Sequence, residues 1–446
     1  MAVSLSPARR AFARRAENIV YRLAGLPVAL AAALGREDDG PHGIIRRAYA
    51  RRYWRPESWA EAAEIPIALL IWPFAIIAAA LYFTWRNGRA VARRCGTSRA
   101  RQLADQLRLA VTKGVLPPWY YIFGLFDRDR LAVADSFLNR FETKRGVYPA
   151  VEKRRMACSP LEDKLAFATH CRAHGLPAAP VIGMSRSGRL HSLASHRLMD
   201  RGLFVKPIAG CGGSDAERWD CEGGGRYMRA DGVRFTTRQL IAYLARRGAG
   251  RPLMIQPRLR NHLAIADLSN GALTTVRVLT CLDELGEPEI VGAVFRMAVG
   301  ANHTVDNAHA GGIISRVDLD TGGLSAATNL GMDARPGWFV RHPDTDAPIA
   351  GRLLPCWPEL RALAVRAHRA FGDRVYIGWD IALLDEGPCL VEGNAAPDVD
   401  LMQRHGAVGL AAQRFGALLA WHLEHEVECA KANLDQRFAR EHDRPG

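Results

Sequence analysis

The sequence predicts an α+β protein of two lobes, preceded by a basic helical N-terminal region with a membrane-associated hydrophobic segment. Three observations indicate this. Apolar strands alternate with helical patterns after residue 160, two strands joined by a polar turn lie at residues 378–394, and nineteen residues at 65–83 carry no charge. A chain of 446 residues is long enough for two or three domains.

The N-terminal region is rich in arginine. We expect a basic helical arm over residues 1–60, a hydrophobic segment over 61–95 and a helical linker over 96–160. Much of the net charge of +14 comes from arginines before residue 160. No nucleic-acid recognition motif accompanies these arginines, and aromatic residues do not interleave with them. We therefore expect no nucleic-acid partner.

The first lobe is expected over residues 161–256, with helices at 161–174 and 236–247 and strands at 181–184, 203–207 and 253–256. The strand Leu203–Pro207 carries one charge, on Lys206, and such a lysine needs an anionic partner. A glycine-rich loop follows it. Glycines let backbone N–H groups approach phosphate oxygens, and the alternative is a flexible surface loop. The loop residues concerned are Gly210, Gly212, Gly213 and Ser214.

The second lobe is expected over residues 257–446. It has long strands at 273–282, 289–297 and 312–319, a helix at 360–371 that packs on them, and a closing helix at 408–438.

The most informative feature of this lobe is the hairpin of strands Gly378–Leu384 and Cys389–Asn394. Side chains two residues apart on a strand point to the same side, so Glu392 and Asn394 can face one ion. Asp380 comes close to them if the two strands pair. Two carboxylates and an amide suit Mg²⁺ better than zinc. The alternative is an ordinary hairpin with polar ends.

The order of these and other motifs resembles the ATP-grasp superfamily, and most closely its sugar-transfer-associated family, which is α-L-glutamate ligase-like. The resemblance runs from about Gly114 to about Gly406. The order of the motifs is more specific than any one of them. They are Gly114–Leu125, Glu162–Phe167, Val205–Pro207, Ile255–His262, Leu273–Val278, Gly311–Ile313 and the hairpin Trp379–Asn394.

The resemblance implies an ATP-grasp fold, with ATP between the two lobes, and it implies roles for individual residues. Lys164 and Lys206 would hold the ATP phosphates under the glycine-rich loop. Lys206 and Arg277 would be catalytic, because both would steady the transferring γ-phosphoryl group. The backbone of Ile255, Gln256 and Pro257, after Met254, would contact adenine. Many relatives have a glutamate here that holds the ribose, so the ribose contact stays open. Asp380, Glu392 and Asn394 would bind one or two Mg²⁺ ions, with Mn²⁺ as an alternative.

The implied reaction is ATP- and Mg²⁺-dependent ligation of a carboxylate to an amine or another nucleophile through an acyl phosphate, in surface polysaccharide or glycan modification. An ATP-grasp phosphotransferase and a non-catalytic nucleotide-sensing scaffold for membrane glycosyltransferases are the alternatives. The expected partners are ATP and a carboxylate-bearing small molecule or a sugar- or lipid-linked acceptor. Asn307, His309 and Gly311 lie in a polar loop that would contact the acceptor or form a solvated connector.

The uncharged run Ile65–Phe83 is long enough to span a bilayer, which takes about 20 residues. If ATP chemistry places the lobes in the cytosol, a single span would put arginine-rich residues 1–64 outside, against the positive-inside rule. A further span at Leu23–Leu34 would remove this conflict but is short. We favour a re-entrant segment broken at Pro73, or an in-plane anchor, on the anionic cytoplasmic face of the inner membrane. The remaining alternative is a buried hairpin of a soluble protein.

Overall fold

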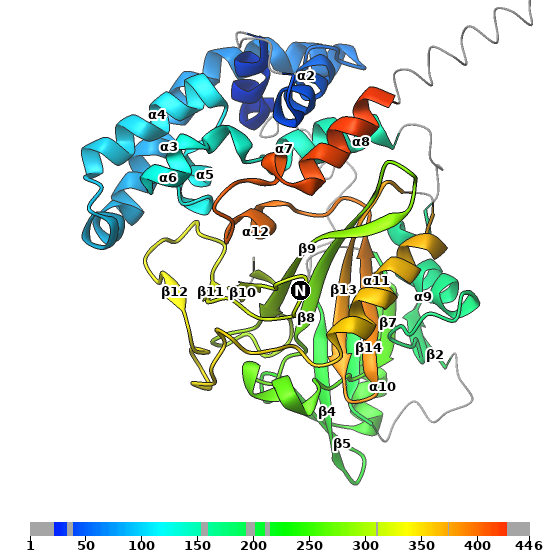
Figure 1. The fold of residues 1–446 in the computed structure, drawn as a ribbon. Coiled ribbons are helices and arrows are strands. Elements are labelled where there is room, and N and C mark those ends of the chain that lie inside the picture. The colour runs from blue at the N-terminus through cyan, green and yellow to red at the C-terminus, as the bar shows by residue number, and fades with distance from the viewer. Residues whose placement is uncertain are drawn as a thin grey trace, which may run out of the picture.

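The computed structural model describes residues 22–33, 39–152, 159–192, 201–209, 215–308, 311–372 and 374–425. A helical module, formed by the described residues between 22 and 152, lies across one side of two antiparallel sheets (Figure 1). The predicted α+β class is confirmed, since each sheet carries helices on a face and the two sheets belong to separate lobes.

The helical module consists of one long helix and several short ones. A helix over Arg22–Ala33 is followed by α2 (Pro41–Tyr53), α3 (Trp59–Cys95), α4 (Arg99–Lys113), α5 (Pro117–Ile122), α6 (Arg128–Ala132), the 3₁₀ turn η1 (Ala134–Ser136), α7 (Arg140–Glu142), the π-helical turn η2 (Thr143–Val147) and α8 (Tyr148–Val151). Ser58 caps the N-terminus of α3 by accepting a hydrogen bond from the Glu61 amide, and Gly96 ends it in the left-handed region.

The expected break at Pro73 is wrong, because α3 is one continuous helix of 37 residues that includes Pro66 and Pro73. Both prolines lie on the exposed side of α3, and the opposite side packs against α4 and α5. A proline removes one helical hydrogen bond and favours a bend. The helix stays continuous because its packed face is held by contacts both before and after Pro73 in the sequence. The hydrophobic segment is therefore not re-entrant.

The proposed first span at Leu23–Leu34 also fails within the described residues. The helix Arg22–Ala33 is short, and its central residues Leu26, Val28 and Ala29 are fully buried against Tyr49 and Tyr53 of α2. Its twelve residues measure only about 18 Å, well short of a bilayer core. It is a core helix of the module.

The first lobe is a seven-stranded antiparallel sheet in the order β2-β1-β7-β3-β4-β5-β6. The helices α9 (Lys164–Ala173), after the 3₁₀ turn η3 (Pro160–Glu162), and α10 (Thr237–Gly250) confirm the predicted helices. The strands are β1 (Gly183–Arg186), β2 (Arg189–Ser192), β3 (Leu203–Pro207), β4 (Glu217–Gly223), β5 (Arg226–Arg229), β6 (Arg234–Thr236) and β7 (Leu253–Pro257). Four of these, β2, β4, β5 and β6, were not predicted because they are mostly polar, and all but β4 are also short.

The second lobe is a seven-stranded antiparallel sheet in the order β12-β11-β10-β9-β8-β13-β14. The helix α11 (Trp357–Ala370) packs on this sheet, and the hydrophobic core between them includes Phe371 and Trp379. The strands are β8 (Thr275–Leu282), β9 (Pro288–Met297), β10 (Ile313–Arg316), β11 (Ala327–Thr328), β12 (Trp338–Phe339), β13 (Tyr376–Leu384) and β14 (Gly387–Asn394), and the 3₁₀ turn η4 (Leu263–Leu268) precedes them.

After the sheets, the chain returns to the helical module through α12 (Asp400–Gln403), the 3₁₀ turn η6 (Leu410–Ala412) and a helix over residues 414–425. The predicted closing helix at 408–438 thus begins later, and its residues 426–438 lie outside the described residues. Phe415, Leu418 and Leu419 of this last helix share a core with Ile45 of α2 and Tyr376 of β13. This shared core fixes the helical module on the second lobe.

Candidate functional site

A cavity of about 540 Å³ lies where the two lobes and the helical module meet. The first lobe contributes residues of β3 and β7, the second lobe contributes residues of β8, β9 and β14, and the module contributes α7 and η2. This volume is within the range of small-molecule sites. The hairpin β13–β14 forms part of its wall, so the predicted Asp380, Glu392 and Asn394 all line one cavity.

The register of the second sheet explains why these three side chains converge. Asp380 of β13 is directly opposite Glu392 of β14, and Gly378 is opposite Asn394. The Asn394 amide nitrogen donates to the Gly378 carbonyl at 3.1 Å, which directs its carbonyl oxygen away from the sheet backbone. No side chain in the described part of the chain hydrogen-bonds or ion-pairs with the Glu392 carboxylate. These oxygen donors fit a hard divalent cation such as Mg²⁺.

Asp380 is also the centre of a buried charge network. Its carboxylate is in contact with Arg277 of β8, whose Nη2 lies 2.8 Å from Oδ2, and with Arg296 of β9 at 3.0 Å. Burial alone would raise the pKa of Asp380, but the two guanidinium groups outweigh it and bring the pKa to about 2. Asp380 is therefore a carboxylate throughout the physiological range.

The network continues to Asp306, which accepts from Arg296 Nη2 at 2.8 Å and from the Thr275 hydroxyl at 2.5 Å. Burial raises the pKa of Asp306, which Arg296 and Thr275 only partly offset. Arg296 and Asp306 were not predicted as site residues. The available signal was Arg296 itself, a charged residue that follows the apolar run Ile290–Phe295 of β9.

The two predicted phosphate-binding lysines face this hairpin from the first lobe. Lys206 at the end of β3 is buried, and burial lowers its pKa, with Lys164 acting in the same direction and Glu392 and Asp380 opposing it. Lys164, at the start of α9, donates to the Ile208 carbonyl at 3.5 Å. Lys164, Lys206 and Glu392 also line one small pocket together. Two ammonium groups thus lie beside the predicted metal ligands.

The predicted adenine segment is β7, a central strand of the first sheet. Gln256 and Pro257 line the cavity, whereas Ile255 is fully buried in the lobe core and its carbonyl accepts from the Ile182 amide. The Gln256 side chain donates to the Ala179 carbonyl at 3.0 Å. Arg258 and Leu259, which follow β7, also line the cavity and were not predicted.

The predicted acceptor loop is only partly described. Asn307 lines the cavity, and Gly311 adopts a left-handed conformation with φ of +94°. His309 and the whole of the predicted glycine-rich phosphate loop, Gly210, Gly212, Gly213 and Ser214, lie outside the described residues. Further cavity residues that the sequence did not single out are Arg140, Lys144, Arg218, Thr275 and Asp398.

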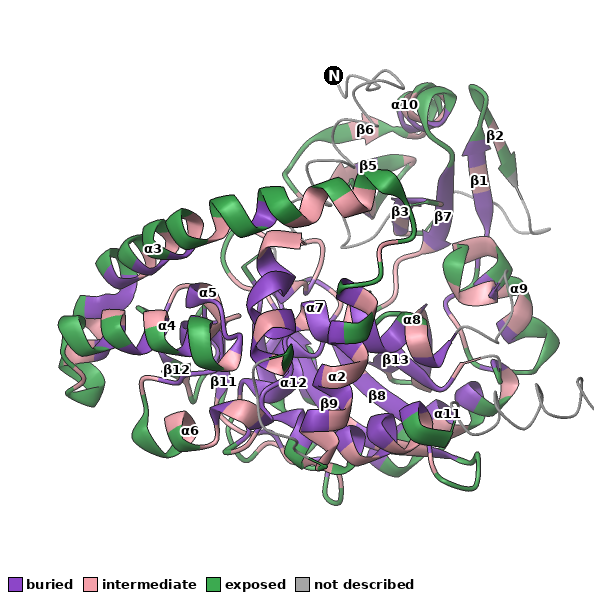
Figure 2. Ribbon diagram, turned by 90° about the horizontal axis from the view of Figure 1, so that it is seen from above, coloured by how far each residue is buried: buried purple, intermediate pink, exposed green. Residues whose placement is uncertain are grey.

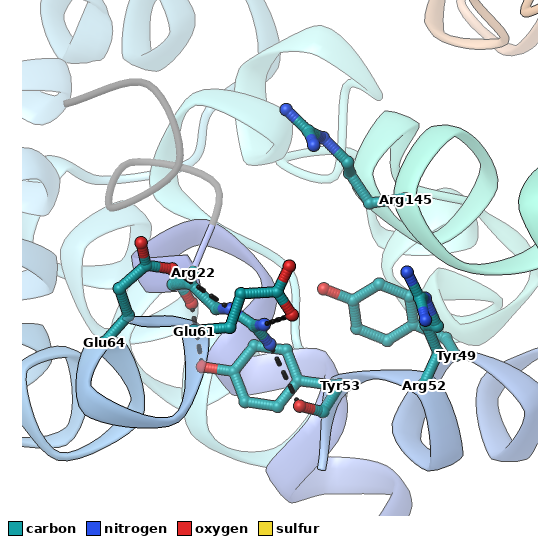
Figure 3. A pocket seen from close by; sticks show the side chains of 7 residues that line it. All are labelled: Arg22, Tyr49, Arg52, Tyr53, Glu61, Glu64 and Arg145. Carbon is teal, nitrogen blue, oxygen red and sulfur yellow. Dashed lines mark hydrogen bonds and ion pairs between the residues drawn. The ribbon is translucent and has the colours of Figure 1, made fainter. Parts of the chain in front are cut away.

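A second, smaller pocket of about 110 Å³ lies inside the helical module, away from the lobes (Figure 3). Its walls are polar, but Arg22 already contacts Glu61 at 2.9 Å and Glu64 at 3.5 Å, and it donates to the Tyr53 carbonyl. These contacts tie α2 and α3 to the first helix. We assign this pocket a structural role within the module.

Two antiparallel sheets around paired lysines, an arginine–carboxylate network and a cluster of side-chain oxygens have the layout of the ATP-grasp fold class. The sequence profile of one family, described as sugar-transfer associated ATP-grasp, matches residues 145–415. The chain therefore belongs to the sugar-transfer associated ATP-grasp family. This confirms the predicted family. The sequence has no match among curated proteins.

Several solved structures are distantly similar. An L-amino acid ligase from Bacillus licheniformis is 10% identical with a TM-score of 0.34, over 59% of this chain and 48% of that one. D-alanyl-alanine synthetase A from Vibrio cholerae is 12% identical with a TM-score of 0.34, over 59% and 65%. N5-carboxyaminoimidazole synthase from Aspergillus clavatus is 13% identical with a TM-score of 0.34, over 59% and 52%. This chain spans less than two-thirds of each of these enzymes, and similarity at this level bears on neither substrate nor reaction.

Proposed function

We propose that this protein is an ATP- and Mg²⁺-dependent ligase that joins a carboxylate to an amine or a related nucleophile, in the modification of a surface glycan. One observation carries the proposal. Lys164 and Lys206 of the first lobe line one small pocket with Glu392 of the second lobe, and Lys206 and Glu392 also line the interlobe cavity with Asn394. Ammonium groups on one side and oxygen donors on the other suit a triphosphate with its metal ion.

The proposed reaction has two steps. A carboxylate oxygen of the acceptor attacks the γ-phosphorus of ATP, so that a new P–O bond forms, the bond to the bridging oxygen breaks and ADP leaves with that electron pair. The amine then attacks the acyl carbon, inorganic phosphate leaves, and the amine loses a proton. Charge develops on phosphoryl oxygens in the first step, and Lys206 and Arg277, which both line the cavity, would stabilise it.

Glu392 and Asn394, with Asp380 between the two arginines, are the residues that would hold Mg²⁺. When bound, the ion neutralises phosphoryl charge and orients the triphosphate. Arg277 and Arg296 hold Asp380 in place and ionised. This pairing positions the Asp380 carboxylate at the cavity wall.

The fate of the γ-phosphoryl group distinguishes the candidate functions. We expect Mg²⁺ and [γ-³²P]ATP to yield free labelled phosphate only when two small-molecule fractions of a cell extract, an acid and an amine fraction, are both present. Label retained on one acceptor would indicate the phosphotransferase instead. Nucleotide binding without turnover in any fraction would indicate the nucleotide-sensing scaffold.

We also propose that α3 lies in the plane of the cytoplasmic face of the inner membrane. Among the described residues, α3 is the one helix that is long and apolar enough to cross a bilayer. Only 17% of its most apolar 18-residue window is buried. Figure 2 shows α3 exposed along most of its length. One face packs on α4 and α5, so the helix lies alongside the protein body. Its exposed apolar residues include Ile67, Leu70, Phe74, Ile77 and Leu81, and Leu69 and Ile71 are exposed beside them.

The surroundings of this apolar face suit a lipid surface. The spacing of three and four residues from Ile67 through Leu70, Phe74 and Ile77 to Leu81 places these five side chains on one stripe of the helix. The exposed aromatic residues Trp59, Tyr82 and Trp85 lie at the ends of the stripe, as is typical of membrane interfaces. Arg86, Arg89 and Arg93 follow on the same helix and are exposed. Each such arginine contributes about 1 kcal/mol near anionic lipid.

Replacing Leu70 and Phe74 together with aspartate should release the protein from membranes. Both side chains are 73% exposed, so folding should be little affected, while burial of each in lipid is worth roughly 1.5–3 kcal/mol. We expect binding to phosphatidylglycerol-containing vesicles to weaken at least about a hundredfold in co-flotation. Leu285→Asp, at a loop residue of the second lobe that is 90% exposed, is the control. Equal flotation of the double variant and the wild type would contradict an in-plane anchor.

A further inference from the structure

We propose that Arg140 and Lys144 of the helical module form an anion subsite in the interlobe cavity, and that this subsite holds the anionic group of the acceptor. The acceptor would therefore be a carboxylate or phosphate compound that enters between the module and the second lobe. This inference rests on the proposed function. It gives the helical module a role in substrate binding, and both residues precede the family match, which begins at residue 145.

The two basic side chains meet at a single carboxylate on the cavity wall. Arg140 Nη2 and Lys144 Nζ each lie 3.3 Å from Asp398 Oδ2. All three residues line the cavity. Two cations meet one carboxylate, and burial together with Asp398 raises the pKa of the nearby Asp400 carboxyl well above its ordinary value, which disfavours a second negative charge there. Arg140 Nε is buried without a hydrogen-bond partner within the described residues. A buried donor of this kind is costly unless a further acceptor satisfies it.

The subsite lies close to the reacting end of the nucleotide. Asp398 follows the proposed metal ligand Asn394 by four residues, and Ala396 and Pro397 between them also line the cavity. The small pocket that holds both phosphate-binding lysines contains neither Arg140 nor Lys144. Lys206 and Glu392 line both this small pocket and the larger cavity, so the subsite would lie beside the proposed triphosphate site, where an acceptor must lie to reach the γ-phosphoryl group.

Charge in the cavity supports a second anion. Seven basic residues line it against four acidic ones, an excess that can accommodate both a nucleotide and a further anionic group. The basic residues are Arg140, Lys144, Lys206, Arg218, Arg258, Arg277 and Arg296, and the acidic residues are Asp306, Asp380, Glu392 and Asp398. Of these, Arg277 and Arg296 are already engaged with Asp380. Arg218 and Arg258 pair with Asp220 behind the cavity wall, which reduces the excess of positive charge from three to two.

The segment that carries Arg140 and Lys144 is held rigidly by the rest of the module. Glu142 of α7 is fully buried, and its carboxylate accepts from Arg46 Nε of α2 at 3.2 Å and from the Asn139 amide at 2.6 Å. The turn that carries Lys144 is π-helical, a form found frequently at functional sites. Tyr148 then stacks on Tyr376 of β13 and donates to the Pro397 carbonyl. These contacts bring the cations to Asp398 without relying on flexible side chains alone.

The test uses the full-length protein saturated with Mg²⁺ and AMP-PNP, so that the triphosphate site is filled. Malonate and inorganic phosphate serve as carboxylate and phosphate probes, and binding is measured by thermal-shift titration. We expect one or both to bind the wild type. Lys144→Gln, which keeps the Arg140–Asp398 pair, should weaken binding about tenfold.

For a second variant we expect probe binding to change in the opposite direction. Asp398→Asn removes the competing carboxylate and leaves both cations in place, so probe binding should tighten several-fold. A purely structural role for the Arg140–Asp398–Lys144 contacts predicts no such gain. Arg128→Gln, an exposed arginine of α6 that does not line the cavity, is the matched control.

Three results would overturn the subsite: no probe binding to the nucleotide-saturated wild type, equal binding to Lys144→Gln, or weaker binding to Asp398→Asn. Loss of AMP-PNP binding in Lys144→Gln would also overturn it, because the residue would then belong to the nucleotide site. A wild type that fails to bind AMP-PNP at all would instead contradict the proposed function, so the two failures are distinguishable.

Discussion

Glu392→Gln should lower ATP turnover by roughly 10²–10³ or more while the protein stays folded. The substitution keeps the size of the side chain and removes its charge. Glu392 is the hairpin carboxylate that no described side chain pairs with, so its charge is available to a cation. Asp380, by contrast, is shared between Arg277 and Arg296. Losing Glu392 therefore removes the main uncommitted negative charge of the proposed metal site.

The measurement is release of ADP at saturating ATP over a range of Mg²⁺ concentrations. The Mg²⁺ concentration for half-maximal turnover should rise, and the unfolding temperature should change little. Glu386→Gln, in the exposed turn of the same hairpin, is the matched control and should behave as the wild type. Normal turnover and normal Mg²⁺ dependence in Glu392→Gln would remove the metal assignment.

Lys206→Met should abolish nucleotide binding and, in the absence of nucleotide, stabilise the protein. Burial lowers the pKa of Lys206 below the ordinary value of 10.5, so the folded protein holds this proton less tightly than the unfolded chain. Stability therefore falls as the pH drops below the unfolded pKa, and at neutral pH the buried ammonium group is a cost. An apolar side chain of similar length removes that cost, which we expect to be worth roughly 0.5–2 kcal/mol.

Two melting experiments check this prediction. The unfolding temperature of Lys206→Met should exceed that of the wild type without ligand, and the rise caused by Mg·ATP in the wild type should disappear. Lys113→Met, at a half-exposed lysine of α4, should change neither quantity appreciably. A variant that is less stable than the wild type, yet still responds to Mg·ATP, would show that Lys206 is a structural residue.

Much of the candidate site was predictable from local pattern. The hairpin register followed from two apolar strands around a polar turn, and it brought Asp380, Glu392 and Asn394 to one wall. Lys206 was recognisable because a lone charge ended an apolar strand. The strands β3, β7, β8 and β9 were also predictable, because each contains an apolar run bounded by turn residues.

Other features depended on contacts between distant segments. Which face of α3 is buried depends on how α4 and α5 pack on it. The same packing keeps α3 helical at Pro73. Arg296 and Asp306 became site residues only when β9 paired with β8 and placed Arg296 opposite Thr275. Short polar strands such as β5 and β6 exist because neighbouring strands offer hydrogen bonds, which local propensity does not report.

The sequence by itself therefore determined the family, the order of the lobes and the residue types of the proposed nucleotide and metal site, because these reside in short motifs with local periodicity. Only the tertiary structure decided that the helical module closes the cavity with Arg140 and Lys144 and that α3 lies along the protein surface. Both depend on pairing between segments separated by up to about 250 residues, such as Lys144 with Asp398. No local sequence pattern shows which of the many lysine and arginine side chains will form an ion pair with a carboxylate so distant in the sequence.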